Sequence, residues 1–304
     1  MKRLTHISIF AIFILSLSSC LKLDSFLYSN SAEETYLLDK YTGEVDFRLD
    51  TVSPAYFIPD SLIHIFTLQS KTAEETSSTK IYALYVGDTS RIKTDTVIMY
   101  CHGNYDHIDF YWPRTKLLAN VGGNLHYGVM TIDYRGFGCS EGVPTEAGMY
   151  ADVNAALQWL KDKGLESTRL IMYGFSLGTA PACELTANPT ILTPSKLILE
   201  DPFASAEVMV QDASKLSMPG SAYVSLKIDN AEEIKKVTQP FLWFHGVDDH
   251  FLSMKTHGAV VFKNYGGDAA NKDSVLVPGA GHSTVPQTYG FANYTKKIAD
   301  FIQK

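Results

Sequence analysis

The chain has 304 residues, of which 45% are hydrophobic and 19% charged, a composition typical of globular proteins and sufficient for one large α/β domain. Two smaller domains would also fit this length, but α/β domains often reach this size. The formal net charge of -7, with no Lys/Arg-rich run, argues against nucleic-acid binding through bulk electrostatics.

The first residues have the pattern of an export signal. Lys2 and Arg3 precede an apolar segment at residues 7–17, ISIFAIFILSL. This segment is shorter than the roughly 18 apolar residues from which a bilayer-spanning helix is inferred. A charged start followed by a short apolar stretch predicts a signal peptide that is removed from the mature protein.

The residues that follow resemble a bacterial lipobox, LSSC at residues 17–20. In that type of signal, cleavage precedes the cysteine, so Cys20 would carry the lipid. An ordinary secretory signal with a chance cysteine is the alternative. We expect residues 1–19 to be the signal, residues 20–40 to be a tether, and the protein to be lipid-anchored in the bacterial cell envelope, periplasmic or at the surface.

Cysteine usage indicates no disulfide framework. If Cys20 is acylated, three widely spaced cysteines remain, Cys101, Cys139 and Cys183. Cys101 ends an apolar run and is expected to be a small buried side chain, whereas pairing of Cys139 with Cys183 stays open. The chain contains no C-x-x-C pair, so a thiolate zinc site is not expected.

The domain is predicted to span residues 41–304 and to begin with strands that have no helices between them. Strand-like runs occur at residues 45–49, 62–68 and 81–86, and the polar stretch at 72–79 (TAEETSST) reads as a hairpin tip. Strands connected in this way predict an antiparallel edge of a sheet.

From residue 96, apolar strands alternate with amphipathic helices. Strands are predicted at 96–100, 128–132, 170–173, 196–199, 241–244 and 274–277. Helices are predicted at 111–119, 146–163, 179–187, 204–218, 229–237, 256–265 and 290–302. This alternation predicts an α/β fold, a mostly parallel sheet with helices on both faces.

The connection at about 202–236 is longer than a tight crossover needs and could host a short cap. Its larger apolar side chains could line an acyl pocket or simply pack the cap; they are Met209, Leu216, Met218, Tyr223 and Leu226.

One serine lies in a distinctive pattern, GFSLG at residues 174–178, between a predicted strand and a predicted helix. A sharp strand-to-helix turn of this type exposes a nucleophilic serine, and small residues two positions away let neighbouring backbone pass. The alternative is a glycine-bounded turn with an ordinary serine. The pattern therefore makes Ser176 a candidate nucleophile.

A serine nucleophile needs a base and an orienting acid, which this arrangement places later in the chain, each after its own strand. HGVDD at residues 245–249 follows one strand, and GAGH at 279–282 follows the last. His282 is the candidate base, and either Asp248 or Asp249 could be the acid. His245, Asp249 and His250 form a poor ligand set, so no metal is expected there.

Two backbone N–H groups are candidates for binding an oxyanion, those of Leu177 after the nucleophile and Asn104 after the strand at 96–100. We assign no chemistry to the His102 side chain. Just beyond Asn104, the side chains of Asp106, His107 and Asp109 are expected to be exposed. The neighbouring aromatic residues are expected to pack a helix, with a place in the substrate wall as the alternative; they are Phe110, Tyr111 and Trp112.

Five segments together resemble the α/β-hydrolase group that includes Bem46-like and ABHD13/ABHD17-like serine hydrolases. They are CHGN at 101–104, DYRGFGCSEG at 133–142, GFSLG at 174–178, HGVDD at 245–249 and GAGH at 279–282. The resemblance covers about residue 95 to 304 and implies the α/β-hydrolase fold. It also places the acid on Asp249 and implies structural roles for Asp133 and Arg135. His250 and Phe251 depart from the short aliphatic pair usual after the acid.

These observations predict a serine hydrolase that cleaves a carboxylic ester, thioester or amide of a small molecule or lipid through an acyl-enzyme. Ser176, His282 and Asp249 would form the triad, and no metal or organic cofactor is expected. Peptidase, lipid deacylase and acyltransferase activities are compatible with the same triad. A non-catalytic binding protein on the same scaffold is the alternative of a different class.

Overall fold

The structure is a computed structural model that describes residues 28, 32–49, 56–123, 125–214, 220 and 224–304. The predicted signal peptide and Cys20 lie outside the described residues. So do three of the side chains proposed to line or pack the cap, Leu216, Met218 and Tyr223.

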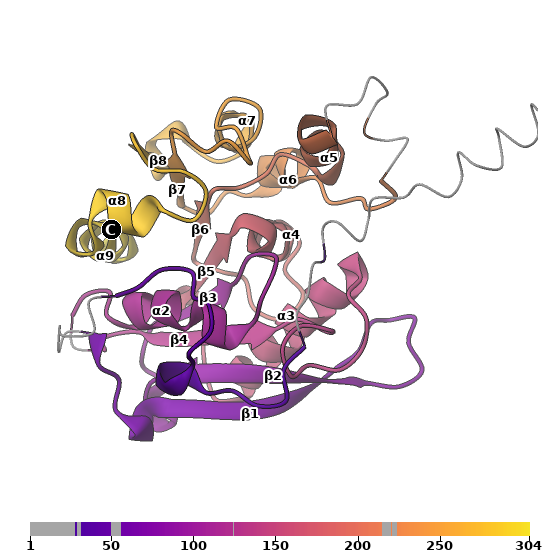
Figure 1. The fold of residues 1–304 in the computed structure, drawn as a ribbon, viewed down its shortest axis with the longest axis vertical. Helices are drawn as coiled ribbons and strands as arrows, with labels where there is room; N and C mark the ends of the chain where they lie inside the picture. Colours follow the sequence, from indigo (N-terminus) through magenta and orange to yellow (C-terminus); the bar gives the residue numbers. More distant parts are fainter. Residues whose placement is uncertain (1–27, 29–31, 50–55, 124, 215–219, 221–223) are drawn as a thin grey trace, which may run out of the picture.

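The core of the domain is an eight-stranded sheet with the strand order β1-β2-β4-β3-β5-β6-β7-β8 (Figure 1). β1 and β2 form an antiparallel hairpin, β2 pairs antiparallel with β4, and all other neighbours are parallel. The strands are β1 (Ile63–Ser70), β2 (Thr79–Val86), β3 (Val97–Cys101), β4 (Gly128–Asp133), β5 (Leu170–Phe175), β6 (Lys196–Glu200), β7 (Phe241–Gly246) and β8 (Lys272–Val277). The predicted mostly parallel sheet with an antiparallel amino-terminal edge is confirmed.

The strand predicted at residues 45–49 is wrong, because this segment has no strand pairing in the described structure. Phe47 and Leu49 instead bury their side chains in the apolar layer on one face of the sheet. The alternating apolar residues correctly indicated buried side chains, but here the burial comes from side-chain packing and not from strand pairing.

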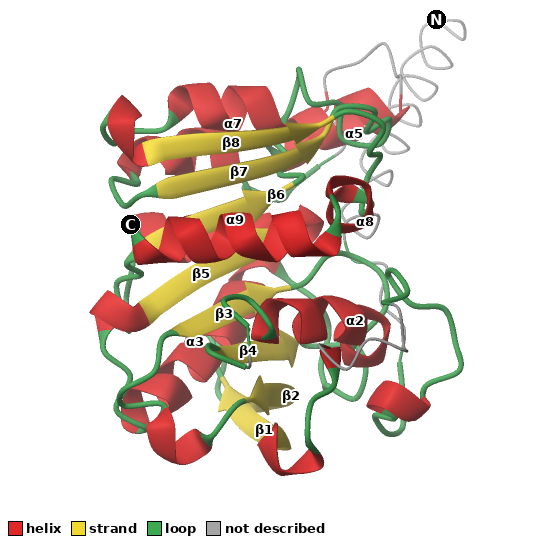
Figure 2. Cartoon of the chain, turned by 90° about the vertical axis from the view of Figure 1, so that its left-hand side faces the viewer, coloured by secondary structure: helices red, strands yellow, loops and turns green. Residues whose placement is uncertain are grey.

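Helices cover both faces of the sheet. α2 (Ile108–Ala119) and α9 (Phe291–Gln303) pack on one face (Figure 2), and α3 (Glu146–Asp162), α4 (Thr179–Ala187) and α7 (Gly258–Asn264) pack on the other. Every residue of the inner strands β3, β4, β5 and β7 is buried, as two-sided coverage requires.

One predicted helix begins earlier in the structure, and another is preceded by a helix that was not predicted. α2 begins three residues before the predicted Tyr111, because His107 caps it through its ring nitrogen, which accepts from the N–H of Asp109. The helix predicted at 290–302 is α9 (Phe291–Gln303), and a short helix that was not predicted, α8 (Val285–Tyr289), precedes it and ends at Gly290 with φ 87°. A positive φ interrupts helical geometry, and glycine adopts it without strain.

Residues 32–40, which the sequence assigned to the tether, lie against the domain. The Tyr36 hydroxyl donates to Asp133 Oδ2 (2.5 Å), and the backbone N–H groups of Leu37 and Leu38 donate to the Asp109 carboxylate (2.8 and 2.7 Å). This docking buries Asp109, and His107 is also buried, so the expectation that both are exposed is wrong. Asp106 is half-buried.

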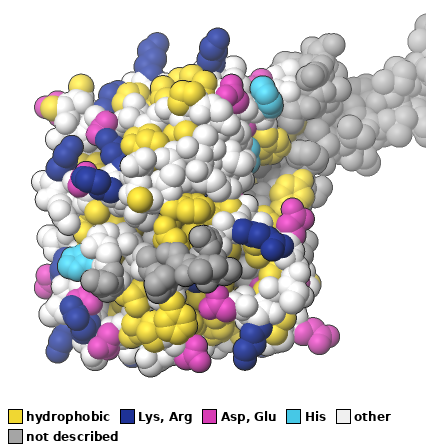
Figure 3. Space-filling model, turned by 60° about the vertical axis from the view of Figure 1, so that its left-hand side comes forward, with side chains coloured by type: hydrophobic (Ala, Val, Ile, Leu, Met, Phe, Trp, Pro, Cys, Tyr) yellow, Lys and Arg dark blue, Asp and Glu magenta, His cyan; other side chains and the backbone are white. Residues whose placement is uncertain are grey.

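Between β6 and β7 the described chain forms α5 (Ala206–Ser214) and the single turn α6 (Asn230–Glu233). In the described part of the chain, no helix has the length and hydropathy of a membrane span. Cys101, Cys139 and Cys183 are free thiols, so the open question of a Cys139–Cys183 disulfide is answered in the negative for this structure. On the face seen in Figure 3, basic and acidic side chains are interspersed.

Candidate active site

Ser176 lies at a sharp turn between β5 and α4, at the carboxyl end of the sheet. Its φ is 51°, in the left-handed region that a residue with a Cβ seldom adopts. The flanking glycines are a steric requirement: a Cβ on Gly178 would lie 2.0 Å from the Cys101 carbonyl oxygen, and one on Gly174 would lie 2.5 Å from the Gly178 oxygen. The turn therefore has the backbone geometry expected of a nucleophile elbow.

His282 and Asp249 converge on this serine from two other loops. The Nε2 atom of His282, in the loop after β8, lies 2.9 Å from Ser176 Oγ, and its Nδ1 lies 2.8 Å from Asp249 Oδ2. The other oxygen of Asp249 accepts the backbone N–H groups of Phe251 and Leu252, both at 2.8 Å. The carboxylate is thus held in place, and it orients the imidazole with its other nitrogen toward the serine.

Asp248, the neighbouring candidate acid, faces elsewhere. Its Oδ2 accepts the backbone N–H of Gly279 (2.7 Å), and its own N–H donates to the Ala280 carbonyl (2.9 Å). Asp248 therefore fastens the loop after β7 to the loop that carries His282, whereas Asp249 contacts the imidazole itself.

The electrostatics of the pair favour an ionised acid and a basic imidazole. Burial by itself would lower the pKa of His282, but the hydrogen bond to Asp249 and the nearby carboxylates of Asp201 and Asp46 raise it above its ordinary 6.5. Burial acts in the opposite direction on Asp249, where the contacts with His282 and the two backbone N–H groups outweigh it and lower the pKa below 3.8.

A second buried carboxyl, Asp201, was missed in the sequence. It directly follows β6 with φ 45°, and its Oδ1 accepts the backbone N–H of Gly246 (2.9 Å). Burial raises the pKa of Asp201 to about 7. Its position directly after a predicted strand, like those of the other site residues, was the signal that could have identified it.

Asp201, His245 and Asp249 are the described residues whose potential ligand atoms gather within 4.8 Å of one another. The His245 ring is already occupied: its Nδ1 accepts from Trp243 Nε1 (3.2 Å), and its Nε2 donates to the Leu252 carbonyl (3.0 Å). Burial lowers the pKa of His245 to about 4, so the ring is neutral. These contacts make His245 a support of the loop that carries Asp249.

Arg114, in the middle of α2, is a second residue that was not predicted, and unlike Asp201 it has no local sequence signal. Its buried guanidinium pairs with Glu200 (2.6 Å) and Asp46 (2.7 Å) and lies 4.1 Å from the centre of the Phe175 ring. It also donates to the Ser283 carbonyl at 3.4 Å. Phe175 and Ser283 adjoin Ser176 and His282, so one side chain braces both loops.

Asn104 and Leu177, the candidate oxyanion donors, both line the space beside Ser176. The Asn104 carbonyl accepts from the Tyr111 hydroxyl (2.7 Å), which fixes the loop after β3. A Cβ at Gly103 would lie 2.8 Å from that hydroxyl, so a larger residue there would have to displace the Tyr111 side chain. Tyr111 packs in the core with Trp112, as predicted, and together with Phe110 it also lines the larger hollow described below.

The residues around the loop after β4 have structural contacts. The buried His102 ring lies 3.2 Å from the Asp133 carboxylate. Arg135 pairs with Asp152 (2.9 Å) and Glu75 (2.7 Å). These contacts agree with the structural roles that the resemblance implied for Asp133 and Arg135.

Ser176 lies at the junction of two hollows. The smaller, of about 20 Å³, is lined by Asn104, Tyr105, Ser176, Leu177, Phe203, Met209 and Phe251. The larger, of about 480 Å³ and called the cleft below, is lined by Glu44, Asn104, Tyr105, Asp106, Phe110, Tyr111, Phe175, Ser176, Phe251, His282 and Ser283.

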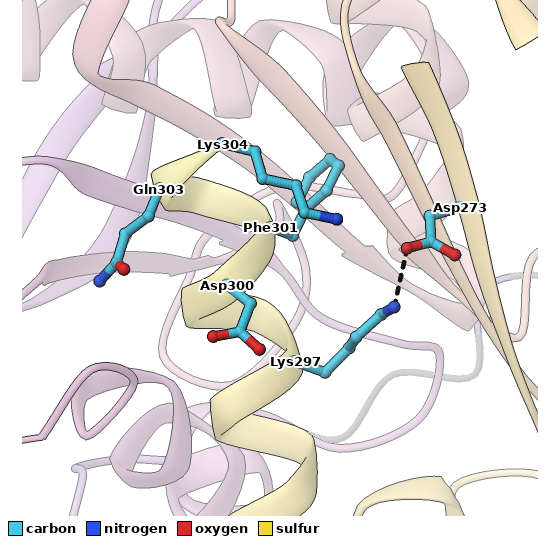
Figure 4. Close-up of a pocket in the computed structure, with 6 residues that line it drawn as sticks. All are labelled: Asp273, Lys297, Asp300, Phe301, Gln303 and Lys304. Carbon is cyan, nitrogen blue, oxygen red and sulfur yellow. Dashed lines mark hydrogen bonds and ion pairs between the residues drawn. The ribbon is translucent and has the colours of Figure 1, made fainter. Parts of the chain in front are cut away.

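A third hollow, of about 370 Å³, lies at the opposite end of the sheet. It is lined by side chains of α9 and the start of β8, and the ion pair between Lys297 and Asp273 (2.7 Å) crosses it (Figure 4). Because it is distant from the carboxyl ends of the strands, it is separate from the serine site.

The fold and this arrangement of loops define an α/β-hydrolase-fold protein. The family model for the α/β-hydrolase fold matches residues 96–218. The chain is 29% identical over 206 residues to α/β-hydrolase domain-containing protein aho-3 of Caenorhabditis elegans, covering 67% of this chain and 57% of that protein. It is 28% identical over 209 residues to α/β-hydrolase domain-containing protein 17B of Homo sapiens, covering 68% of this chain and 66% of that protein.

Among solved structures, the Pyrococcus furiosus esterase Pf2001 superimposes with a TM-score of 0.61 at 16% identity, covering 79% of this chain and 92% of the esterase. This likeness supports the fold. The matches to aho-3 and 17B span less than two thirds of those proteins' own lengths. The chain has the α/β-hydrolase fold, and its sequence is similar to those of aho-3 and α/β-hydrolase domain-containing protein 17B.

Proposed function

We propose that the protein is a serine hydrolase that cleaves a carboxylic ester or thioester through an acyl-enzyme. The observation that carries the proposal is the chain of contacts Ser176 Oγ–His282 Nε2 (2.9 Å) and His282 Nδ1–Asp249 Oδ2 (2.8 Å) at a strained turn. A nucleophile within hydrogen-bond reach of a base, which is itself oriented by an acid, is the geometry that such catalysis needs.

In the proposed reaction, Ser176 Oγ attacks the substrate carbonyl while His282 Nε2 takes the hydroxyl proton. The negative oxygen that forms would be bound by the backbone N–H groups of Leu177 and Asn104. His282 then gives its proton to the leaving alcohol or thiol as the bond from the carbonyl carbon breaks. Water repeats the sequence on the acyl-enzyme, releasing a carboxylic acid and restoring Ser176.

The experiment is fluorophosphonate labelling combined with hydrolysis of p-nitrophenyl acetate. We expect Ser176→Ala to abolish labelling. Turnover should fall to the activity that oxyanion binding alone supports, which in other enzymes is about 10³–10⁴-fold above the reaction in water. Thr179→Ala is a matched control, since it also removes a buried hydroxyl from this turn. Labelling and full activity in Ser176→Ala would contradict the proposal.

We further propose that the protein is exported and tethered to a membrane through a lipid on Cys20. The support is the sequence alone: Lys2 and Arg3, a short apolar segment and LSSC at 17–20. Cys20→Ala should block lipid addition and normal processing of the full-length protein. The same lipid-labelled species in the membrane fraction after this substitution would refute the tether.

A further inference from the structure

The two hollows beside Ser176 are assigned to different halves of the substrate by the position of His282. His282 must protonate the leaving group, so the leaving group has to lie on the side that the imidazole faces. Among the described residues, His282 lines the cleft and does not line the smaller hollow. The cleft therefore receives the leaving group, and the smaller hollow receives the acyl group.

The smaller hollow, as its described residues bound it, has the size of a short acyl group. Its volume of about 20 Å³ is close to the space that one water molecule occupies, and its walls include the apolar side chains of Leu177, Phe203 and Met209. An acetyl methyl group fits this size and chemistry.

The charges that line the cleft are negative. Glu44 and Asp106 contribute carboxylates, and no Lys or Arg is found among the described residues of its wall. No ion pair of either carboxylate occurs within the described chain. The neighbouring imidazole of His107 faces another carboxylate, that of Glu33, at 3.1 Å. Apart from the catalytic His282, the described wall of the cleft thus offers two carboxylates without a cationic partner to whatever enters it.

Aromatic rings complete the same wall. Tyr105 is 51% exposed and Phe251 43% exposed, and both line the cleft together with Phe110. Phe251 also packs edge-on against the His282 ring, with centroids 5.1 Å apart, so it lies beside the atom that protonates the leaving group. Aromatic faces attract cations when the two approach within about 6 Å, and they do not attract anions.

We propose that the preferred substrate is an ester or thioester of a short acyl group whose leaving group carries an ammonium. The acidic side chains and the exposed rings would attract the cation, and His282 would protonate the oxygen or sulfur that departs. This inference rests on the proposed serine hydrolase activity and adds the class of leaving group.

The test compares acetylthiocholine with S-(3,3-dimethylbutyl) thioacetate, which has the same shape and no charge, by following thiol release. For the wild-type protein we expect kcat/KM to favour the cationic probe by about three- to tenfold at low salt, as two partly solvated carboxylates would give. This preference should fall toward one in 1 M salt, where the Debye length is about 3 Å.

Substitutions locate the preference. Asp106→Asn and Glu44→Gln should each lower the cationic-to-neutral ratio about two- to threefold, and asparagine tolerates the φ of 59° at position 106. Asp300→Asn is the control, because it changes the net charge equally but lies on α9 in the third hollow (Figure 4), away from the cleft. We expect the ratio to be unchanged in that variant.

The outcomes separate this inference from the function on which it rests. A ratio near one in the wild type, or a ratio that neither cleft substitution alters, would overturn the cationic leaving group. Fluorophosphonate labelling of Ser176 without turnover of either thioacetate would also overturn it, through the short acyl group. If the wild-type protein shows neither labelling nor turnover of p-nitrophenyl acetate, the proposed serine hydrolase activity itself is refuted.

Discussion

Replacing each of the two adjacent aspartates with asparagine tests how the site orients its base. In the wild type, Asp249 Oδ2 accepts from His282 Nδ1, which leaves Nε2 free to take the Ser176 proton. In Asp249→Asn, the amide can present its NH₂ group to Nδ1, so the proton moves to Nε2 and faces the serine. The base would then hold the wrong tautomer.

The expected magnitude follows from that mechanism. Loss of the correct tautomer in a serine protease lowers kcat about 10⁴-fold, which corresponds to roughly 5 kcal/mol of barrier. Asp248→Asn should cost less than tenfold, because its side chain binds the Gly279 N–H and an amide oxygen can accept the same hydrogen bond. The same adjacent pair therefore supplies both the test and its matched control.

The assay is kcat/KM on p-nitrophenyl acetate across pH, with the melting temperature measured for each variant. Asp249→Asn should also shift the acid limb to lower pH, because Asp249 raises the pKa of His282. A large loss confined to Asp248→Asn would refute the assignment of the acid. Near-wild-type rates in both folded variants would refute the triad.

Three further predictions concern the supports of the site. In the wild type, kcat/KM should rise with pH through a pKa above 6.5, that of His282. Asp201→Asn should move this acid limb of the pH profile to lower pH, because the substitution removes a carboxylate that raises the pKa of His282. An acid limb that does not move would contradict this coupling. Gly178→Ala should lower the free energy of unfolding by about 3 kcal/mol in urea titrations. Gly281→Ala is the control: its Cβ would meet only a carbonyl oxygen at 3.7 Å, so it should change the free energy of unfolding by less than about 0.5 kcal/mol. Equal effects of the two substitutions would refute the steric account. Arg114→Met leaves two buried carboxylates without their cation and should lower the free energy of unfolding by about 3–5 kcal/mol. Arg91→Met, which removes an exposed ion pair, should lower it by at most about 1 kcal/mol. A small effect of Arg114→Met would show that burial of these charges is compensated elsewhere.

Local sequence patterns were sufficient to predict the class of fold and to identify the candidate catalytic residues in its loops. Apolar strands alternating with helices place polar residues after strands at one edge of a parallel sheet, and Ser176, His282 and the Asp248–Asp249 pair all follow such strands. The segment at residues 45–49 shows what such a pattern leaves open, because its alternating apolar residues indicated burial but did not specify a strand partner.

The tertiary structure decided what spacing along the chain leaves open. Adjacent side chains at the end of a strand point in different directions. The residues alone left Asp248 and Asp249 open, the resemblance favoured Asp249, and the fold supplies the contacts: Asp249 lies against His282 while Asp248 binds Gly279. Arg114 has no local signature, since its partners Asp46 and Glu200 are 68 and 86 residues away in sequence. The sequence was therefore sufficient to identify the candidate residues at the turns, because the backbone geometry there admits few side chains. The pairings were determined by packing, because contacts between distant segments depend on how the sheet and helices assemble.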